Sequence, residues 1–282
     1  MTELGWYNQA MKTLVTHINP HLDDICAIWL FKRFHPDFAG SKVEFVSASK
    51  GNLPTEESAD TVYLGVGRGR FDEHKGDLED CAASLVWKFL KEEGFTPKDD
   101  ILAGTMEELV DWVRLDDLGK LKDLPYKDFD VPAFLRIYGG KEVKPSEENL
   151  ELGMNILDRI YLVLQDKHRA IKDFEKRKEF ETKFGKGVAV ESEFVNRAFC
   201  DTKEGDVFLM LDPRFHSVQF YTPKEEIDLE PIYNKVKELD PEAQWFLHQS
   251  HKMVLCGSGS APDSKPTKLS FEELIEVLKG VD

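Results

Sequence analysis

Residues 15–29 read VTHINPHLDDICAIW and place two histidines and two aspartates just before an apolar segment. TLVTH (13–17) predicts a short strand, and DDICAIWLFKRF (23–34) predicts a helix for which Asp23 or Asp24 can be the N-cap. In α/β proteins, ligands bind beyond the carboxyl ends of parallel strands. The stretch therefore predicts a strand, a loop rich in metal-binding side chains, and then a helix.

The same alternation of strands and helices continues through residues 1–125. Capping-box spacing marks Thr105 and Glu108 as the start of one helix. Interleaved strands and helices predict an α/β domain with a largely parallel sheet. The further strands are expected at 42–49 and 60–67, and the further helices at 80–94 and 105–117.

The rest of the chain predicts a connecting region and a second domain. Residues 126–185 are expected to form a connecting loop and a long charged helix over roughly 146–184, with Ser146 as its N-cap. Residues 186–282 are expected to form a smaller C-terminal α/β domain. Its strands are predicted at 207–212, 217–223 and 252–257, and its helices at 229–239 and after Ser270.

Composition narrows the class of protein. The 282 residues are 41% hydrophobic, which is enough for a packed core. No apolar run approaches the roughly 18 residues of a membrane span, and residues 1–12 lack the basic and apolar regions of a signal peptide. The four cysteines are scattered, without a CxxC pair. We therefore expect a soluble, cytoplasmic protein that does not bind membranes; composition carries no signal of its oligomeric state.

The net charge of −16 bears on the partner. Tight binding of nucleic acid usually depends on Lys and Arg side chains that neutralise phosphates. Long nucleic acid is therefore an unlikely partner. A small phosphorylated substrate or a short oligonucleotide is compatible with this negative net charge, because divalent metals can supply positive charge locally.

Two clusters near the predicted strand ends can carry chemistry. His17, His21 and Asp23 have the ligand types that suit Mn, Zn or Fe; the alternative is a packed histidine and an ordinary helix cap. GVGRGRFDEHKGD (65–77) offers further ligands or proton-transfer groups, or is only a glycine turn with a charged tail. Its candidates are Asp72, Glu73 and His74 for ligation or catalysis, and Arg68 and Arg70 for phosphate binding.

Two later stretches are weaker candidates. Asp116 and Asp117 fall at the end of a predicted helix, where the helix dipole disfavours carboxylates. HQSHKMVLCGSGS (248–260) contains a glycine-rich loop that can cradle an anion, although it is also an ordinary turn. The predicted substrate-binding residues there are His248, His251, Lys252, Gly257, Ser258 and Gly259.

Taken together, these stretches resemble the DHH phosphoesterase superfamily. Its first motif, H-x-x-P-D-x-D, is similar to HINPHLD (17–23), and its Asp-His-His triplet is similar to Asp72-Glu73-His74. GRFDEH resembles the RFDHH segment of the melanocyte-proliferating-gene type of exonuclease, and the region from His248 is similar in position to a late HxSG segment of that branch. The resemblance spans most of the chain.

The resemblance implies two Mn²⁺ or similar ions on the first domain and a second domain that closes over the substrate. His17, His21, Asp23, Glu73 and Asp116 (or Asp117) carry over as metal ligands. One departure is important. Relatives have an aspartate that bridges the two metals at the end of the third strand, where this chain has Gly65. Glu73 or Asp72 then bridges instead, or the site holds a single metal or is catalytically weak.

The function expected from this resemblance is a metal-dependent phosphoesterase that hydrolyses a phosphodiester or phosphoanhydride, with nucleotides or short oligonucleotides as substrates. Mn²⁺ is the expected metal, with Zn²⁺, Fe²⁺ or Mg²⁺ as alternatives. Two other functions stay open. A degenerate relative would bind nucleotide or a partner without turnover, and a zinc-dependent deacetylase would share only the superficial similarity of NPHLDD to an HPDD loop.

Overall fold

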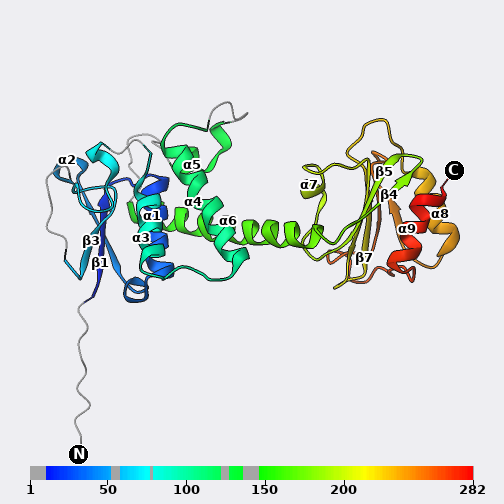
Figure 1. Cartoon of the computed structure of the whole chain (residues 1–282), viewed down its shortest axis with the longest axis horizontal. Coiled ribbons are helices and arrows are strands. Elements are labelled where there is room, and N and C mark those ends of the chain that lie inside the picture. Colours follow the sequence, from blue (N-terminus) through cyan, green and yellow to red (C-terminus); the bar gives the residue numbers. More distant parts are fainter. Residues whose placement is uncertain (1–10, 52–57, 77–78, 122–126, 136–145, 282) are drawn as a thin grey trace, which may run out of the picture. The chain divides into compact units, whose positions relative to one another are not determined.

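The computed structural model describes residues 11–51, 58–76, 79–121, 127–135 and 146–281. The chain divides into two compact units, Met1–Leu164 and Gln165–Asp282 (Figure 1). Among the described helices, none has the length and apolarity that a membrane crossing requires.

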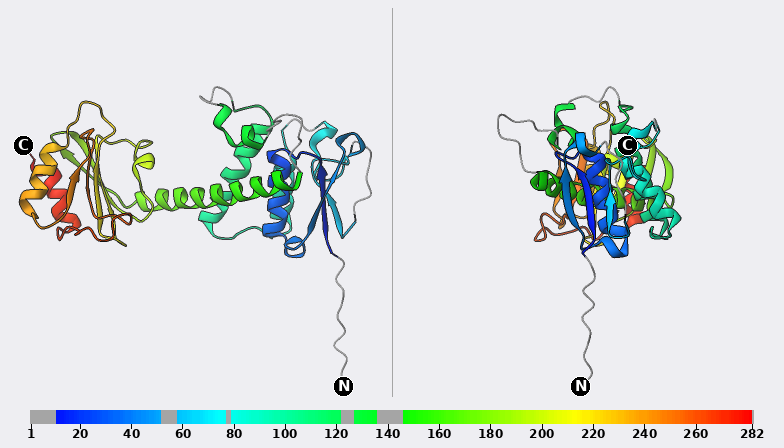
Figure 2. Two further views of the ribbon diagram at one scale, coloured as in Figure 1. Left: turned by 180° about the vertical axis from the view of Figure 1, so that it is seen from behind. Right: turned by 90° about the vertical axis from the view of Figure 1, so that its left-hand side faces the viewer.

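The first unit is built on a parallel three-stranded sheet. Its strand order is β2 (Lys42–Val46), β1 (Thr13–His17), β3 (Thr61–Tyr63), with both neighbours parallel to β1. Helices α1 (Leu22–Phe34) and α3 (Ala82–Glu92) pack against each other on one side of this sheet (Figures 1 and 2). The predicted α/β class and the parallel N-terminal sheet are therefore confirmed.

The helices bury a core that the apolar pattern of α1 anticipates. Ten consecutive residues of α1 from Leu22 to Phe31 are buried, and Trp29 and Phe31 are among the largest fully buried side chains. Such burial on all sides is typical of a helix in the middle of a domain. The remaining elements of this unit are α2 (Ala48–Gly51), α4 (Asp100–Asp117), α5 (Val131–Leu135) and the short 3₁₀ turns Pro36–Phe38, Glu73–Lys75 and Lys127–Phe129.

The start of helix α4 and the end of helix α6 differ from the sequence prediction. Helix α4 begins at Asp100 rather than near Thr105, because the Asp99 side chain accepts the Leu102 N–H at 3.0 Å and caps the helix one turn earlier. Helix α6 covers Ser146–Phe174 and ends ten residues before the predicted 184. The chain then turns into strand β4 (Lys178–Thr182), which pairs with its neighbour as an antiparallel hairpin.

The second unit is a six-stranded mixed sheet covered on both faces. Strand β6 reads VFLMLD, and its side chains enter two cores. Val207, Leu209 and Leu211 pack with α8 and α9, whereas Phe208 and Met210 pack with α7 and the end of α6. Figure 1 shows α8 and α9 on one side of the sheet and α7 on the other. A strand buried on both faces is a continuous apolar run, which is the pattern here.

The strand order of this sheet is β4-β5-β6-β7-β9-β8, and only the β5–β6 pair is parallel. The elements are β5 (Gly185–Glu191), β6 (Val207–Asp212), β7 (Ser217–Tyr221), β8 (Trp245–Leu247), β9 (Met253–Cys256), α7 (Arg197–Cys200), α8 (Glu230–Leu239) and α9 (Phe271–Gly280). Ser270 caps α9 through its side chain, as the capping-box spacing with Glu273 predicts.

Gly153 offers a test of the packing of α6 against α1. A Cβ at this position would lie 2.8 Å from Cγ2 of the buried Ile25. Gly→Ala in an open helix is stabilising by about 1 kcal/mol, but overpacking a core costs about 1–3 kcal/mol. We expect Gly153→Ala to lower the free energy of unfolding by about 1 kcal/mol, measured by urea denaturation. Gly280→Ala, with nothing within 4 Å, is the matched control and should cause no loss.

Candidate metal centre

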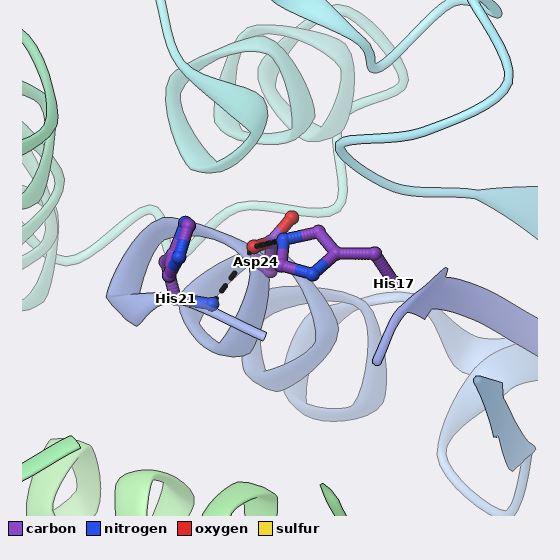
Figure 3. Close-up of side chains that lie close together, drawn as sticks. All are labelled: His17, His21 and Asp24. Carbon is purple, nitrogen blue, oxygen red and sulfur yellow. Dashed lines mark hydrogen bonds and ion pairs between the residues drawn. The ribbon is translucent and has the colours of Figure 1, made fainter. Parts of the chain in front are cut away.

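The carboxyl end of β1 brings two histidines against the first turn of α1 (Figure 3). The His17 Nδ1 lies 2.8 Å from the Ile18 carbonyl oxygen, which can only accept, so Nδ1 carries a proton there. The other ring nitrogen, Nε2, lies 2.8 Å from Asp24 Oδ2. The backbone N–H of His21 donates to the same Oδ2 at 2.9 Å. The N-cap of α1 is therefore His21, and the prediction that Asp23 or Asp24 is the N-cap is wrong. Asp24 caps the helix as the third helical residue of a capping box and at the same time contacts a predicted ligand.

Cys81 belongs to a second group of ligand atoms. Asp23, Cys81 and Asp117 each place one such atom within 4.8 Å of the others, as do His17, His21 and Asp24. Cys81 is fully buried at the N-terminus of α3. Sequence analysis did not identify it as a candidate, because a single cysteine before an apolar helix is typical of ordinary packing.

The loop after β3 contributes the third group, Asp72, Glu73 and His74. The Asp72 carboxylate is 1% exposed and accepts hydrogen bonds from the N–H groups of Arg68 (2.6 Å) and His74 (3.0 Å) and from the His74 ring (2.9 Å). It therefore shapes the loop and orients His74. Oε2 of Glu73, in contrast, is buried without a hydrogen-bond partner, which suits an oxygen that binds a cation.

Members of all three groups line one pocket of about 610 Å³ in the first unit, although Cys81 and Asp72 are not among its lining residues. Its walls carry carboxylates and imidazoles, and no Lys or Arg is among the lining residues. The acids therefore outnumber the basic groups of the pocket lining, which are histidines only. The described lining residues are His17, His21, Asp23, Asp24, Ala48, Gly65, Val66, Glu73, His74, Gly76, Asp80, Asp117 and Leu118.

Burial and mutual repulsion raise the pKa values of three acids in this pocket. Burial, followed by the charges of Asp24 and Asp117, raises the pKa of Asp23 well above its ordinary value. Burial raises the pKa of Glu73 to about 7. Burial and the Asp24 charge likewise raise the pKa of Asp117. A cation among these groups would remove the repulsion, which is the electrostatic signature of a functional site.

At His17, hydrogen bonding and the charge of a neighbour together affect the pKa more strongly than burial does. Burial by itself lowers the pKa of its ring, but the hydrogen bond and the charge of Asp24 outweigh burial and raise the pKa to about 9. Without metal, the ring is therefore protonated at neutral pH and forms an ion pair with Asp24. A metal at Nε2 would replace that proton, while Nδ1–H···O=C keeps the ring in place.

The pocket residues fit a divalent metal by three criteria. The donors are imidazole and carboxylate, the pairing preferred by Mn, Fe and Zn. One carboxylate oxygen, Glu73 Oε2, lacks a partner. The acids also lie close together without Lys or Arg among the lining residues. His17, His21, Asp23, Glu73 and Asp117 are the residues that would hold metal.

Four predicted residues of the first unit lie outside the pocket lining, and one of them is Asp72, which shapes the loop beside it. Asp117 lines the pocket, and its neighbour Asp116 is not among the lining residues. Arg68 is exposed and contributes its backbone N–H to Asp72. The Arg70 guanidinium stacks over Phe89, 4.2 Å from the ring centroid, and pairs with Glu92. Arg70 therefore packs on the aromatic core.

The predicted substrate-binding residues of the second unit have local partners. The Lys252 ammonium donates to the carbonyl oxygens of Ile227 (2.7 Å) and Glu225. The His251 Nδ1 lies 3.0 Å from the Asp228 carboxylate. His248 contacts the Ser250 hydroxyl through Nδ1, at 2.8 Å.

Gly257 has a positive φ of 71°, a conformation that favours glycine. Its carbonyl oxygen accepts from the Ser217 hydroxyl, which ties the predicted glycine-rich loop to β7. Ser258 and Gly259 follow in that loop, and Gly259 lies beside Phe215. A substrate-binding role for this loop stays a prediction.

Comparisons with known proteins give distant similarities to solved structures. No family model and no curated protein matches the chain. A solved structure to which it is similar is described as an exopolyphosphatase-related protein from Bacteroides fragilis; the match covers 95% of this chain and 90% of that chain at 10% identity, with a TM-score of 0.25. Proteins this dissimilar need share neither fold nor substrate, so the pocket has to be interpreted from its own residues.

Proposed function

We propose that this protein is a metal-dependent phosphoesterase that hydrolyses a phosphodiester or phosphoanhydride of a nucleotide or short oligonucleotide. The observation that carries the proposal is a pocket lined by members of two groups of ligand atoms, which are linked in sequence by the neighbours Asp23 and Asp24. Two neighbouring divalent ions are a recurring arrangement for phosphoryl transfer.

The pocket residues would have two different roles, metal binding and contact with the substrate. His17, His21, Asp23, Glu73 and Asp117 would hold divalent metal, which supplies positive charge for the phosphoryl group and an activated water when bound. His74 lines the same pocket with a side chain that is 63% exposed, and Asp72 orients it through Nδ1. His74 is therefore placed to contact substrate and to give a proton to the leaving oxygen.

The absence of Lys and Arg from the pocket lining has a consequence for binding. An anionic substrate entering a pocket of carboxylates is repelled unless a cation neutralises them. Substrate binding, and not only turnover, should therefore require metal. Mn²⁺ is our proposed metal; Cys81, whose pKa burial raises to about 12, would favour Zn²⁺ or Fe²⁺ if its thiol ligates.

Elemental analysis tests the proposal. Purified protein should hold near-stoichiometric Mn, Fe or Zn after reconstitution, and both His17→Ala and Asp23→Ala should remove it, because each deletes a ligand. His248→Ala, in the second unit, is the matched control and should keep the metal. Loss of metal should coincide with loss of hydrolysis in a screen of nucleotides and short RNAs.

Other metal contents would support other functions. A wild-type protein without metal after incubation with Mn²⁺, Zn²⁺ and Fe²⁺ would contradict the phosphoesterase and leave a module that binds nucleotide or a partner without turnover. One zinc ion with no phosphoesterase activity would favour the deacetylase alternative. The screen should therefore include acetylated amino sugars.

A further inference from the structure

Gly65 lies beyond the end of β3 and faces the Asp24 carboxylate. A Cβ at this position would lie 1.9 Å from Asp24 Oδ1 and 3.2 Å from its Cγ, which no side chain could occupy without displacing Asp24. The φ of Gly65 is +64°. Residue 65 is therefore compatible only with glycine while Asp24 keeps its place.

The two oxygens of Asp24 have different surroundings. Both hydrogen bonds shown for this carboxylate, from His17 Nε2 and from the His21 N–H, end on Oδ2. Oδ1 is the oxygen directed at Gly65. A carboxylate that served only as a helix cap would need Oδ2 alone. Capping the helix does not require the space that Gly65 leaves for Oδ1 beyond the end of β3.

Asp24 also lies between the groups of ligand atoms. It is 2% exposed, shares one group with His17 and His21, and follows Asp23, which belongs to the other. Its charge reaches Glu73 and Asp117 as well, since it raises the pKa of both.

We propose that Asp24 is a direct metal ligand shared by the two groups, and that Gly65 is the residue that makes room for it. This inference rests on the proposed metal centre. A carboxylate supplied by the first turn of α1 thus takes the place that a side chain at the end of β3 would otherwise fill. Asp24 has two functions, because the same carboxylate also caps the helix.

Two variants test the role of Asp24 by different routes. Asp24→Asn keeps an oxygen that can accept the His21 N–H but removes the charge. Gly65→Ala leaves every proposed ligand in place and forces Asp24 aside. Gly76→Ala is the matched control: Gly76 lines the same pocket and has a positive φ of 106°, but a Cβ there meets nothing within 4 Å.

Mn²⁺ stoichiometry and affinity, measured by isothermal titration calorimetry and by electron paramagnetic resonance, are the readouts. We expect two ions per chain in the wild type and in Gly76→Ala. Both Asp24→Asn and Gly65→Ala should bind at most one, with affinity for the remaining ion lowered by more than about 100-fold, the upper end of the effect of residues that only orient ligands. Circular dichroism confirms that each variant is folded.

Unchanged stoichiometry in both variants, with affinity lowered by about 10–100-fold or less, would overturn the inference, because Asp24 would then only orient His17. That outcome leaves the proposed function intact. A wild type that binds no metal would instead contradict the proposed function itself. If Asp24→Asn does not fold, Gly65→Ala decides, since it retains the helix cap residue.

Discussion

Asp23→Asn is expected to abolish metal binding and hydrolysis and yet to stabilise the metal-free protein. Asp23 is 4% exposed, and burial together with the nearby Asp24 and Asp117 charges raises its pKa well above the ordinary value. The loss of a ligand should lower hydrolysis by on the order of 10³-fold, equivalent to several kcal/mol of transition-state stabilisation.

The sign of the stability effect follows from the pKa. A carboxyl whose pKa is higher in the folded than in the unfolded protein favours folding when protonated, and this contribution is lost as pH rises through the folded-state pKa. Above the pKa of the unfolded chain, Asp23 therefore destabilises the metal-free protein relative to a neutral side chain, and asparagine removes this penalty. We expect the melting temperature to rise by about 2–6 °C at pH 8 and to change little at pH 4.

Asp80 is the matched control in the same pocket. Burial raises its pKa, but hydrogen bonds from Lys88 and Ser84 outweigh burial and lower the pKa below its ordinary value. Its charge therefore stabilises the fold above the pKa of the unfolded chain, and this contribution is lost as pH falls through the folded-state pKa. Asp80→Asn should lower the melting temperature at pH 8. If both variants shifted it in the same direction, the repulsion assigned to Asp23 would be contradicted.

Binding of Mn²⁺ at pH 7 is expected to release protons, and His17 should account for about one of them. Its pKa of about 9 in the metal-free protein keeps Nε2 protonated and paired with Asp24 at neutral pH. A metal ligand must be unprotonated. Glu73, with a pKa of about 7, adds about half a proton at that pH.

Calorimetric titrations in two buffers of different ionisation enthalpy measure the number of protons. His17→Gln should lower that number by about one and weaken metal binding, whereas His248→Gln should change neither. For the wild type, apparent affinity should rise with pH up to about 9, by up to about tenfold per pH unit from this histidine alone. An affinity independent of pH between 6 and 9 would contradict the assignment of His17 as a ligand.

The same histidine sets a trend in the stability of the metal-free protein. Its folded-state pKa of about 9 lies above the ordinary 6.5, so the stability it contributes is complete below pH 6.5 and is lost as pH rises through about 9. Asp23 acts in the same direction. The metal-free fold therefore loses stability as pH rises, but only Asp23 is placed at a cost, because its carboxyl is buried among like charges, whereas the ion pair of His17 with Asp24 stabilises the fold at neutral pH.

Local sequence patterns were sufficient for much of the fold. Strand β1 and the body of α1 follow from TLVTH and the apolar run after Asp24, because periodicity and caps act within one element. The parallel sheet follows from the interleaving of strands with helices. The start of α4 and the strand β4 were not anticipated, since Asp99 and Thr105 both suit an N-cap and a charged stretch can form either a helix or an edge strand.

The sequence by itself determined that His17, His21, Asp23 and Asp24 lie near the end of β1, because only a few residues separate them and the strand and helix on either side are strongly marked. That Asp24, and not Asp23, shares a group of ligand atoms with the two histidines was decided only by the tertiary structure. Only the tertiary structure decided that Cys81 and Asp117 join Asp23, and that the Asp24 carboxylate occupies the space beside Gly65. These contacts link residues tens of positions apart. Their distances depend on how α1, α3 and α4 pack, and no local preference for helix, strand or turn encodes that packing.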